Sequence, residues 1–483
     1  MPPVVVTSGG AVRGTLEDGL TVFRGIPYAA PPVDDLRWRR ARSHPGWSGV
    51  RDATRHGPSA PQPYLPGGGN TVLGEHGSPP FSEDCLTLNV WTPGLDGASR
   101  PVLVWIHGGG FTTGSGSIPY YAGETFARDG DLVVVTINYR LGPFGYLHGM
   151  VPGHSNLWLS DQAAALSWVA ENAAAFGGDS GAITLMGQSG GALSIGALAQ
   201  HPTAAPLFHR AIAQSAPLGL DLPSHEDAAE RTDAMARLLG HADRRGLLGE
   251  PTARLVEGTI AVLRRFAEFG TWDLAFTPVL DDLMPAHPRD ALADPRIELL
   301  IGWTEDEGTF RFASDPQYAT STVDDVVAVL RKRHQDPERV YRDYADAVGD
   351  DPRAVLSAEC GDHLFRNPGN DVLARRADSG ITYAYEFALD SPAFGGTLGA
   401  THCLELPFTF ANAEKWTGAP FLTGIDPEVV RSLGTRMHRS WISFVRDGTP
   451  EPGFPRWPAS DGKTLMVFDA VSGVAGTRAG EPR

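Results

Sequence analysis

The chain has 483 residues, of which 42% are hydrophobic and 20% are charged, a composition typical of a globular protein with a large buried core. Its formal net charge of -17 argues against nucleic acid and anionic membrane surfaces as partners. The N-terminal residues lack the pattern of a signal peptide, and no apolar segment approaches the ~20 residues that span a bilayer. We therefore expect a cytoplasmic protein with no membrane partner.

The cysteine count supports the same compartment. Cys85, Cys360 and Cys403 lie far apart and show no C-x-x-C spacing, which argues against a zinc or redox-active cysteine site. Three cysteines cannot all pair within one chain, so we expect reduced thiols in a reducing compartment. The sequence implies no metal and no organic cofactor.

The first hundred residues contain short β-like segments, such as 20–23 and 86–91, between turns rich in proline and glycine. Two continuous apolar runs follow at 101–106 and 131–137. Such runs are typical of strands that are buried on both faces of a mostly parallel sheet. The pattern then alternates between strands and helices.

A helix is predicted over 160–170, because apolar residues recur there at alternating steps of four and three. Ser160 is its expected N-cap, and Gly177–Gly178 is its expected stop. We expect a single domain over residues 1–483. Its later elements are strands at 182–188, 298–302 and 381–387, an amphipathic helix at 427–444, and a helical region at 220–275 that is a candidate cap over the site.

The segment 182–198 has the pattern of a buried strand, a sharp turn and a helix, with G-x-S-x-G at the turn. The turn strains the backbone of Ser189, and glycine at Gly187 and Gly191 removes collisions on either side of it. The serine hydroxyl is then exposed at a helix N-terminus, where developing negative charge is favoured. Ser189 is therefore the candidate nucleophile.

A serine hydroxyl needs a base within hydrogen-bond reach and an acid that orients the base. In proteins with this elbow, the order along the chain is serine, acid, histidine. His402 follows the strand at 381–387 and a glycine-rich loop, so it is the candidate base. The same criterion leaves four other histidines open: His201, His209, His241 and His363.

The candidate acid lies just beyond the strand at 298–302, because sites form at the carboxyl ends of parallel strands. Three carboxylates stand there, Glu305, Asp306 and Glu307. We select Glu307, although spacing alone does not choose among the three. The other two are expected to belong to a solvated acidic turn.

The glycine-rich stretch His107-Gly108-Gly109-Gly110 directly follows the strand at 101–106. Acyl transfer generates an oxyanion, which backbone N–H groups can stabilise, and consecutive glycines let such groups approach a substrate. The N–H group of Gly190, next to the serine, adds a further donor. His107 precedes the serine in the sequence, so we interpret it as a residue that structures this loop.

Together these residues resemble the type-B carboxylesterase family, the α/β-hydrolases that include bacterial para-nitrobenzyl esterases and the cholinesterases. The resemblance covers nearly the whole chain, and its most specific parts are F-R-G-I-P-Y-A at 23–29 and S-E-D-C-L-T-L-N-V at 82–90. It implies an α/β-hydrolase fold, with a large, mostly parallel central sheet flanked by helices and a small N-terminal antiparallel sheet.

The resemblance also implies a role for each candidate. Ser189 would attack an ester carbonyl, His402 would take its proton, and Glu307, in the D-E-G block of the family, would hold the imidazole. The base must be neutral, so activity is expected to rise with pH at roughly pH 6–7, where imidazoles lose a proton. The oxyanion hole would consist of the N–H groups of Gly109, Gly110 and Gly190.

Several residues around the site are implied in the same way. Ser215 matches a serine that lies close to the triad in the family. Arg37–Glu83 and Arg140–Asp161 are expected to be buried structural ion pairs. Gln188 stands directly before the nucleophile, where the family usually has Glu, and this difference removes a negative charge beside the site.

The predicted function is a serine carboxylesterase that hydrolyses small-molecule esters through an acyl-enzyme on Ser189. One alternative is cleavage of amides, carbamates or lactones by the same residues. Another is a non-catalytic binding role, since the fold includes members that lost the nucleophile. The natural substrate and the choice between monomer and homodimer stay open. Five aromatic residues are candidates for lining the pocket, and most of them could equally belong to the core: Phe111, Tyr120, Trp158, Phe310 and Phe394.

Overall fold

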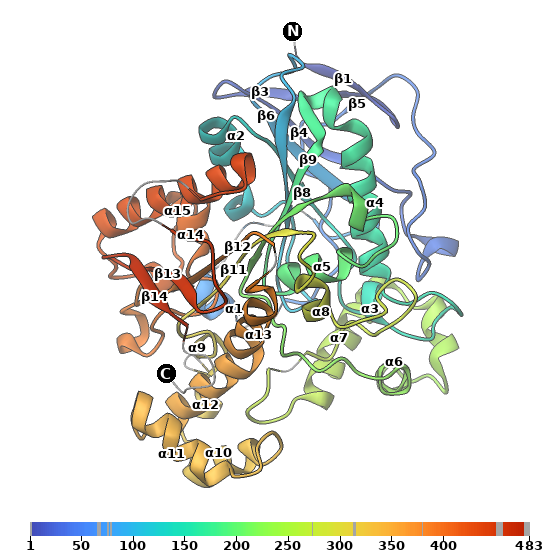
Figure 1. The fold of residues 1–483 in the computed structure, drawn as a ribbon. Coiled ribbons are helices and arrows are strands. Elements are labelled where there is room, and N and C mark those ends of the chain that lie inside the picture. The colour runs from blue at the N-terminus through green and yellow to red at the C-terminus, as the bar shows by residue number, and fades with distance from the viewer. Residues whose placement is uncertain are drawn as a thin grey trace.

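The computed structural model describes residues 2–64, 69–74, 77, 80–272, 274–312, 315–378, 380–450 and 457–477. A large central sheet runs through these residues (Figure 1). Its strands are β3 (Thr15–Glu17), β4 (Leu20–Pro27), β6 (Thr87–Thr92), β7 (Arg100–Ile106), β8 (Val133–Ile137), β9 (Gly178–Gln188), β10 (Arg210–Gln214), β11 (Glu298–Thr304), β12 (Thr382–Phe387), β13 (Thr464–Phe468) and β14 (Gly473–Gly476).

The strand order in this 11-stranded sheet is β14-β13-β12-β11-β10-β9-β7-β8-β6-β4-β3. Neighbours from β13 to β8 pair in parallel, whereas β14, β6, β4 and β3 pair antiparallel. A smaller sheet near the N-terminus joins β1 (Val4–Thr7) and β2 (Gly10–Arg13) as an antiparallel hairpin, with β5 (Val50–Asp52) parallel to β2. The predicted fold class is confirmed.

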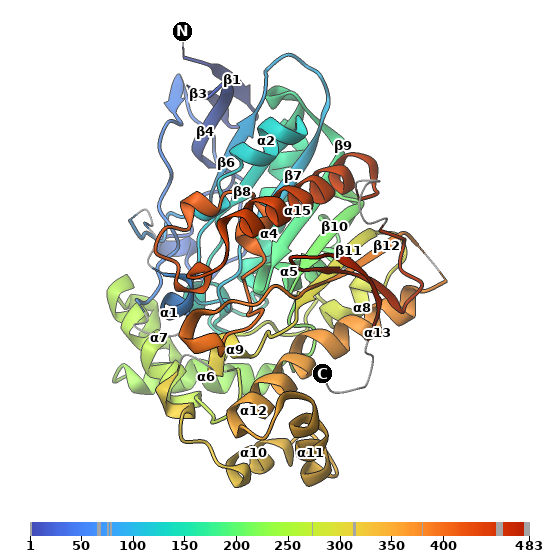
Figure 2. The ribbon, with the colours of Figure 1, turned by 90° about the vertical axis from the view of Figure 1, so that its left-hand side faces the viewer.

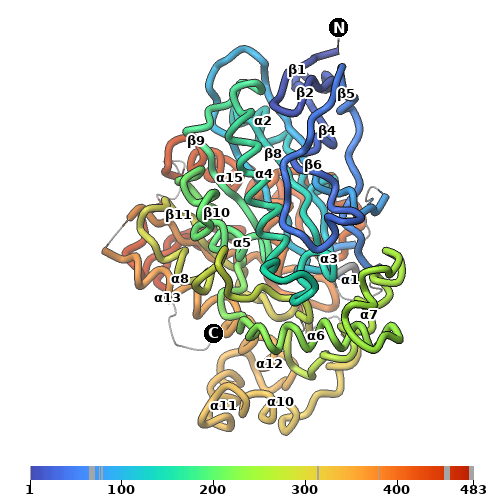
Figure 3. The backbone as a smooth tube through the Cα atoms, turned by 90° about the vertical axis from the view of Figure 1, so that its right-hand side faces the viewer, coloured from blue at the N-terminus to red at the C-terminus, as the bar shows by residue number. Residues whose placement is uncertain are grey.

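Strand β7 shows why helices cover both faces of the central sheet. Successive side chains of a strand point to opposite faces, and both sets are apolar in β7. Val102, Val104 and Ile106 belong to one buried cluster, whereas Leu103 and Trp105 belong to another. The first cluster includes α4 (Leu157–Asn172) and α5 (Gly190–Leu198), and the second includes α2 (Glu124–Gly130) and α15 (Pro427–Asp447), which lie on opposite faces in Figures 2 and 3.

The remaining helices lie around this core. They are α1 (Gly69–Leu73), α3 (Gly142–Tyr146), α6 (His225–Leu238), α7 (Thr252–Phe266), α8 (Pro288–Leu292), α9 (Thr309–Phe312), α10 (Val323–Leu330), α11 (Pro337–Val348), α12 (Pro352–Gly361), α13 (Asn367–Arg376) and α14 (Leu406–Thr409). Helices α6 and α7 fall within the region 220–275 that is the candidate cap. Together with α10, α11 and α12 they occupy the lower end of the molecule, opposite the small sheet (Figure 1).

The helix predicted over 160–170 exists, but its expected N-cap is wrong. Helix α4 begins at Leu157, directly after Asn156 in the left-handed region with φ 45°. Ser160 lies inside the first turn, and its Oγ accepts a hydrogen bond of 2.9 Å from the N–H of Ala41. The hydroxyl therefore serves a distant segment, which a local capping rule does not detect. The predicted stop is confirmed, since Gly177 ends the helical stretch with φ 79°.

The two ion pairs implied by the family resemblance are present. Arg140 Nη2 lies 2.7 Å from Asp161 Oδ1, and the side chains are 2% and 0% exposed. Asp161 Oδ2 also accepts a hydrogen bond from the backbone N–H of Arg140. Arg37 Nη2 lies 2.5 Å from Glu83 Oε1, although the Arg37 side chain is 18% exposed and so only partly buried.

Asp161→Ala is expected to lower the free energy of unfolding by about 3–5 kcal/mol, because it leaves the Arg140 guanidinium buried without its partner. The matched control is Glu428→Ala, which breaks the exposed pair with Arg431 on α15 and should cost about 1 kcal/mol or less. Urea unfolding followed by circular dichroism measures both. Equal losses in the two variants would contradict this ranking.

Candidate active site

The candidate residues follow adjacent parallel strands. Ser189 comes directly after β9 and Ser215 after β10, while Glu307 and His402 lie in the segments that follow β11 and β12. The N–H of Ser189 donates a hydrogen bond of 2.9 Å to the carbonyl of Gln214 at the end of β10. Because the carboxyl ends of these strands meet at one edge of the sheet, residues far apart in the sequence come together there.

The predicted serine elbow is present. Ser189 has φ 56° and ψ -127°, a strained conformation for a residue with a side chain, and it directly precedes α5. A Cβ atom on Gly187 would lie 2.5 Å from the carbonyl oxygen of Gly191. Only glycine therefore fits at this position of the turn, as the G-x-S-x-G spacing predicts.

His402 and Glu307 form a buried pair. Nδ1 of His402 is hydrogen-bonded to Oε2 of Glu307, and the two side chains are 3% and 2% exposed. The other oxygen, Oε1, accepts a hydrogen bond of 2.8 Å from the N–H of Thr304. A carboxylate on Nδ1 keeps the proton on that nitrogen and leaves Nε2 as the acceptor. This tautomer is the one that a general base requires.

The neighbouring carboxylate of Asp306 has a different partner. Its Oδ2 accepts a hydrogen bond of 2.9 Å from the N–H of Ala400, two residues before His402. Asp306 and Glu305 are both partly exposed, unlike Glu307. The structure thus brings Glu307 to the imidazole of His402, while Asp306 holds the backbone of the same loop.

Nε2 of His402 faces the side chain of Gln188. The amide nitrogen of Gln188 lies 3.1 Å from Nε2 of His402 and 3.2 Å from Sγ of Cys403. In the part of the chain that the structure describes, no hydrogen bond joins His402 to Oγ of Ser189. The imidazole of His402 therefore contacts Gln188, the residue directly before the candidate nucleophile.

The other histidines have different surroundings. His241 pairs with Glu250 at 2.6 Å, and none of the four histidines left open by the sequence bonds to the elbow within the described ranges. His107 stacks on Tyr139, with ring centroids 4.5 Å apart, and its Nδ1 lies 2.8 Å from the carbonyl of Gly108. Burial lowers the pKa of His107 to about 4. These contacts agree with a structural role in the glycine loop.

The glycine loop presents free backbone donors next to Ser189. Gly109 has φ 119°, and a Cβ atom there would lie 2.1 Å from the carbonyl oxygen of Thr113. Its own carbonyl accepts hydrogen bonds from the N–H groups of Thr112 and Thr113. Among the described residues, no acceptor is recorded for three N–H groups, those of Gly109, Gly110 and Gly190.

A narrow apolar cavity of about 10 Å³ lies beside Ser189. That is about the room one water molecule needs, so the space as it stands is too small for an ester. Phe111, named from the sequence, lines this cavity. The sequence did not single out the other wall side chains. Pro217, Trp272 and Leu274 lie in irregular segments, and Leu364 and Phe365 lie in the π-helical turn between α12 and α13.

Three aromatic rings surround His402. The ring centroids of Trp272, Phe310 and Phe365 lie 5.4, 5.5 and 5.1 Å from that of His402. Phe310 is thus near the site, as the sequence suggested. The other three aromatic residues do not line the cavity beside Ser189: Tyr120 stacks on Trp416 and Trp158 on Tyr146 within the core, and Phe394 is exposed.

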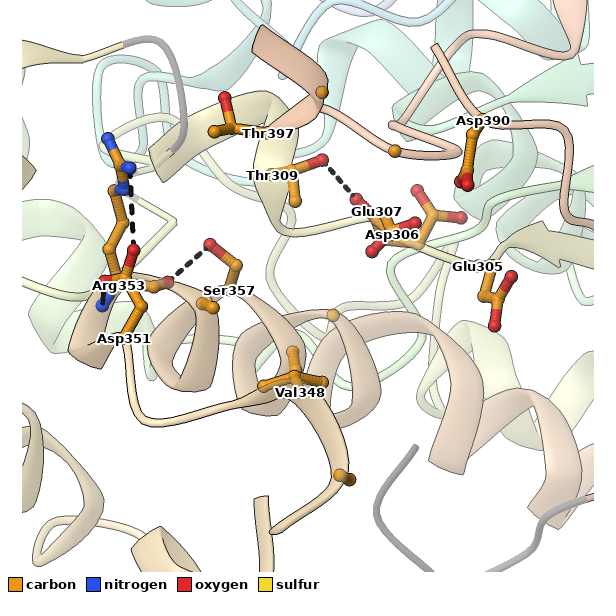
Figure 4. A pocket seen from close by; sticks show the side chains of 16 residues that line it. Glu305, Asp306, Glu307, Thr309, Val348, Asp351, Arg353, Ser357, Asp390 and Thr397 are labelled. Atoms are coloured by element: carbon orange, nitrogen blue, oxygen red, sulfur yellow. Dashed lines mark hydrogen bonds and ion pairs between the residues drawn. The ribbon is translucent and has the colours of Figure 1, made fainter. Parts of the chain in front are cut away.

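A larger cavity, of about 460 Å³, opens beside Glu307 (Figure 4). Its lining includes the carboxylates of Glu305, Asp306, Asp351 and Asp390 and the guanidinium of Arg353, but neither Ser189 nor the glycine loop. Size alone would favour this cavity as the binding site. Ser189, Gly110 and Gly190 line the smaller cavity instead, so the candidate nucleophile and two of the candidate oxyanion donors lie there.

The described ranges of the chain contain no cluster of three or more His, Cys, Asp or Glu side chains suited to a metal ion. They also contain no helix with the length and hydropathy needed to span a bilayer.

Comparisons with a family model, with related sequences and with solved structures agree with one another over nearly the full length of this chain. Residues 1–474 match the family model described as "Carboxylesterase family". The chain is 54% identical to phenmedipham hydrolase of Pseudarthrobacter oxydans over 478 residues, which cover 98% of this chain and 96% of that protein. It is 35% identical to para-nitrobenzyl esterase of Bacillus subtilis, with 97% and 95% covered. The structure of a Geobacillus stearothermophilus carboxylesterase superposes with a TM-score of 0.87 at 34% identity, covering 98% of each chain.

Proposed function

The chain belongs to the carboxylesterase family, and from this premise we propose that Ser189, His402 and Glu307 are its catalytic nucleophile, base and orienting acid. The protein is a carboxylic ester hydrolase. The observation that carries the residue assignment is the buried contact between Glu307 and Nδ1 of His402, next to the strained elbow of Ser189.

Acylation begins when Oγ of Ser189 attacks the ester carbonyl carbon and Nε2 of His402 takes the hydroxyl proton. The carboxylate of Glu307 stabilises the imidazolium that forms. The tetrahedral intermediate then collapses: the carbon–oxygen bond to the alcohol breaks, and His402 returns the proton to the leaving oxygen. A water molecule repeats the attack on the acyl-enzyme with the same base, which releases the acid and restores Ser189.

The negative charge of the tetrahedral intermediate needs donors that are in place before the reaction. The N–H groups of Gly109, Gly110 and Gly190 meet this requirement, because they have no acceptor among the described residues, and Gly110 and Gly190 line the cavity beside Ser189. Loss of one such donor typically costs about 3–4 kcal/mol of transition-state stabilisation. We assign Ser215 and Gln188 to the surroundings that hold the triad in place.

A fluorophosphonate probe tests the assignment of the nucleophile directly. We expect stoichiometric labelling, with mass spectrometry locating the adduct on Ser189. Prior acylation with a slowly hydrolysed ester should block it. Labelling of another residue, or an active protein that the probe does not modify, would contradict the assignment. Absence of both labelling and activity would reopen the non-catalytic alternative.

One observation favours a second substrate class. The 54% identical relative is named for phenmedipham, which is a carbamate. The same residues can cleave a carbamate, because nucleophilic attack, oxyanion and proton transfer are unchanged. Comparing p-nitrophenyl butyrate, its anilide and an aryl N-methylcarbamate would rank the three classes; we expect the ester and the carbamate to be turned over faster than the anilide.

Leu274→Ala is expected to raise kcat/KM for a tert-butyl ester several-fold relative to the n-butyl ester. Cδ2 of Leu274 lies 3.1 Å from the point where a Cβ atom of Gly110 would stand, so this side chain limits the space above the glycine loop. The matched control is Leu248→Ala at an exposed leucine outside the cavity. Gas chromatography of released alcohol measures both ratios, and an unchanged ratio in Leu274→Ala would contradict this role.

We also propose that the protein acts in the cytoplasm on small molecules, without a nucleic acid or membrane partner. Cys85, Cys360 and Cys403 are buried free thiols, which suits a reducing compartment. The net charge of -17 disfavours polyanionic partners. Cell fractionation with an antibody against the protein would test the compartment.

A further inference from the structure

Gln188 and Ser189 are neighbours in the sequence, and the proposed function requires both of them at the same atom. A neutral imidazole whose Nδ1 proton is held by a carboxylate has a single lone pair left, on Nε2. In this structure the amide nitrogen of Gln188 lies 3.1 Å from that atom. The hydroxyl of Ser189 needs the same lone pair in order to lose its proton.

The orientation of the Gln188 amide follows from its two contacts. The NH2 group carries two donors, and it lies within hydrogen-bond distance of Nε2 of His402 and of Sγ of Cys403. Both atoms can accept a hydrogen bond, and Gln188, His402 and Cys403 are all buried. Reversing the amide would set its oxygen against the lone pair on Nε2 of the neutral imidazole, so this orientation is the one that suits the Nδ1-protonated tautomer.

We propose that Gln188 is a positioning residue that holds His402 in its neutral, Nδ1-protonated form between turnovers and yields Nε2 to Ser189 when substrate binds. This role rests on the proposed function. It explains how the base can be fixed in a buried site without a hydrogen bond from the nucleophile. It also gives the amide at position 188 a role that differs from that of a carboxylate.

An amide and a carboxylate at position 188 differ in how they interact with the protonated imidazole of His402. An imidazolium presents an N–H group at Nε2, and the NH2 group of Gln188 offers it no acceptor. A carboxylate at position 188 would accept that proton and stabilise the cation. With Gln188 in place, the protonated form is therefore disfavoured, and His402 stays available as a base at lower pH than it would beside a glutamate.

Other titratable side chains around His402 also bear on the stability of its protonated form. Glu307 supplies the negative charge on Nδ1, and Asp306 is held by the N–H of Ala400. Burial raises the pKa of Glu405 well above its usual value, which favours the neutral form of this carboxyl. Burial likewise raises the pKa of Cys403 and of Tyr385, and Asp362 pairs with Arg366 at 3.0 Å on the turn that carries Phe365.

The test compares Gln188→Glu with Gln188→Met, which keeps the length of the side chain but removes donor and acceptor. The pH dependence of kcat/KM for p-nitrophenyl butyrate is measured between pH 5 and 9. We expect Gln188→Glu to move the acid limb to higher pH by about 1 unit or more. Gln188→Met should move it in the same direction by less, because the neutral imidazole loses one hydrogen bond. Thermal unfolding by circular dichroism checks that each variant is folded.

A spectroscopic readout tests the contact independently of turnover. In protein labelled with ¹⁵N-histidine, loss of the hydrogen bond in Gln188→Met should move the Nε2 resonance of His402 downfield, and His402→Asn identifies that resonance. Unchanged acid limbs in two folded variants, or an unchanged resonance, would overturn the role of Gln188. Failure of the fluorophosphonate to label Ser189 would instead show that the proposed function is wrong.

Discussion

Replacing Ser189 by alanine is expected to lower kcat/KM for p-nitrophenyl butyrate by about 10⁴- to 10⁶-fold. The loss is large because the acyl-enzyme cannot form, and residual hydrolysis would depend on water attacking a substrate held by the glycine loop. Alanine keeps the Cβ atom and so the same backbone strain, and it removes only the hydroxyl, so the variant should fold as well as the wild type. Initial rates at saturating and at low substrate separate kcat from KM.

Ser167→Ala is the matched control for this change. The Ser167 hydroxyl donates to the carbonyl of Ala163 within α4, away from the elbow. The same chemical change there should leave kcat/KM close to that of the wild type. If Ser189→Ala retained more than about a hundredth of the activity, the bulk of hydrolysis would have to occur by another route, and the nucleophile assignment would fail.

Glu307→Gln is expected to lower kcat by about 10³- to 10⁴-fold. A glutamine has nearly the same shape, but it removes the charge that stabilises the imidazolium. Its NH2 group can also face Nδ1, which would move the imidazole proton to Nε2 and leave no lone pair for the Ser189 proton. The change is electronic rather than steric, so KM should change much less than kcat.

The control for Glu307→Gln lies two residues away. Glu305→Gln makes the same substitution on a partly exposed carboxylate of the same turn, and we expect it to change kcat little. The comparison also decides between two of the three adjacent acids, which spacing in the sequence could not do. A larger loss in Glu305→Gln than in Glu307→Gln would contradict the assignment of the acid.

Several features could be predicted from local sequence because local sterics determine them. The elbow at Ser189 needs glycine at Gly187, where a Cβ atom would meet a backbone oxygen. The apolar run in β7 must be buried on both faces, since neither set of its side chains is polar. Where the sequence prediction was wrong, a distant partner decided the outcome: Ser160 bonds to Ala41 rather than capping its own helix.

The sequence by itself determined the family, the order of serine, acid and histidine, and the need for a glycine loop, because motifs of adjacent residues encode backbone shape. Only the tertiary structure decided which side chains close the cavity and that Gln188 contacts Nε2 of His402. Such contacts join distant residues, 214 positions apart for Gln188 and His402. They depend on how neighbouring strands end at one edge of the sheet, and no local pattern records that arrangement.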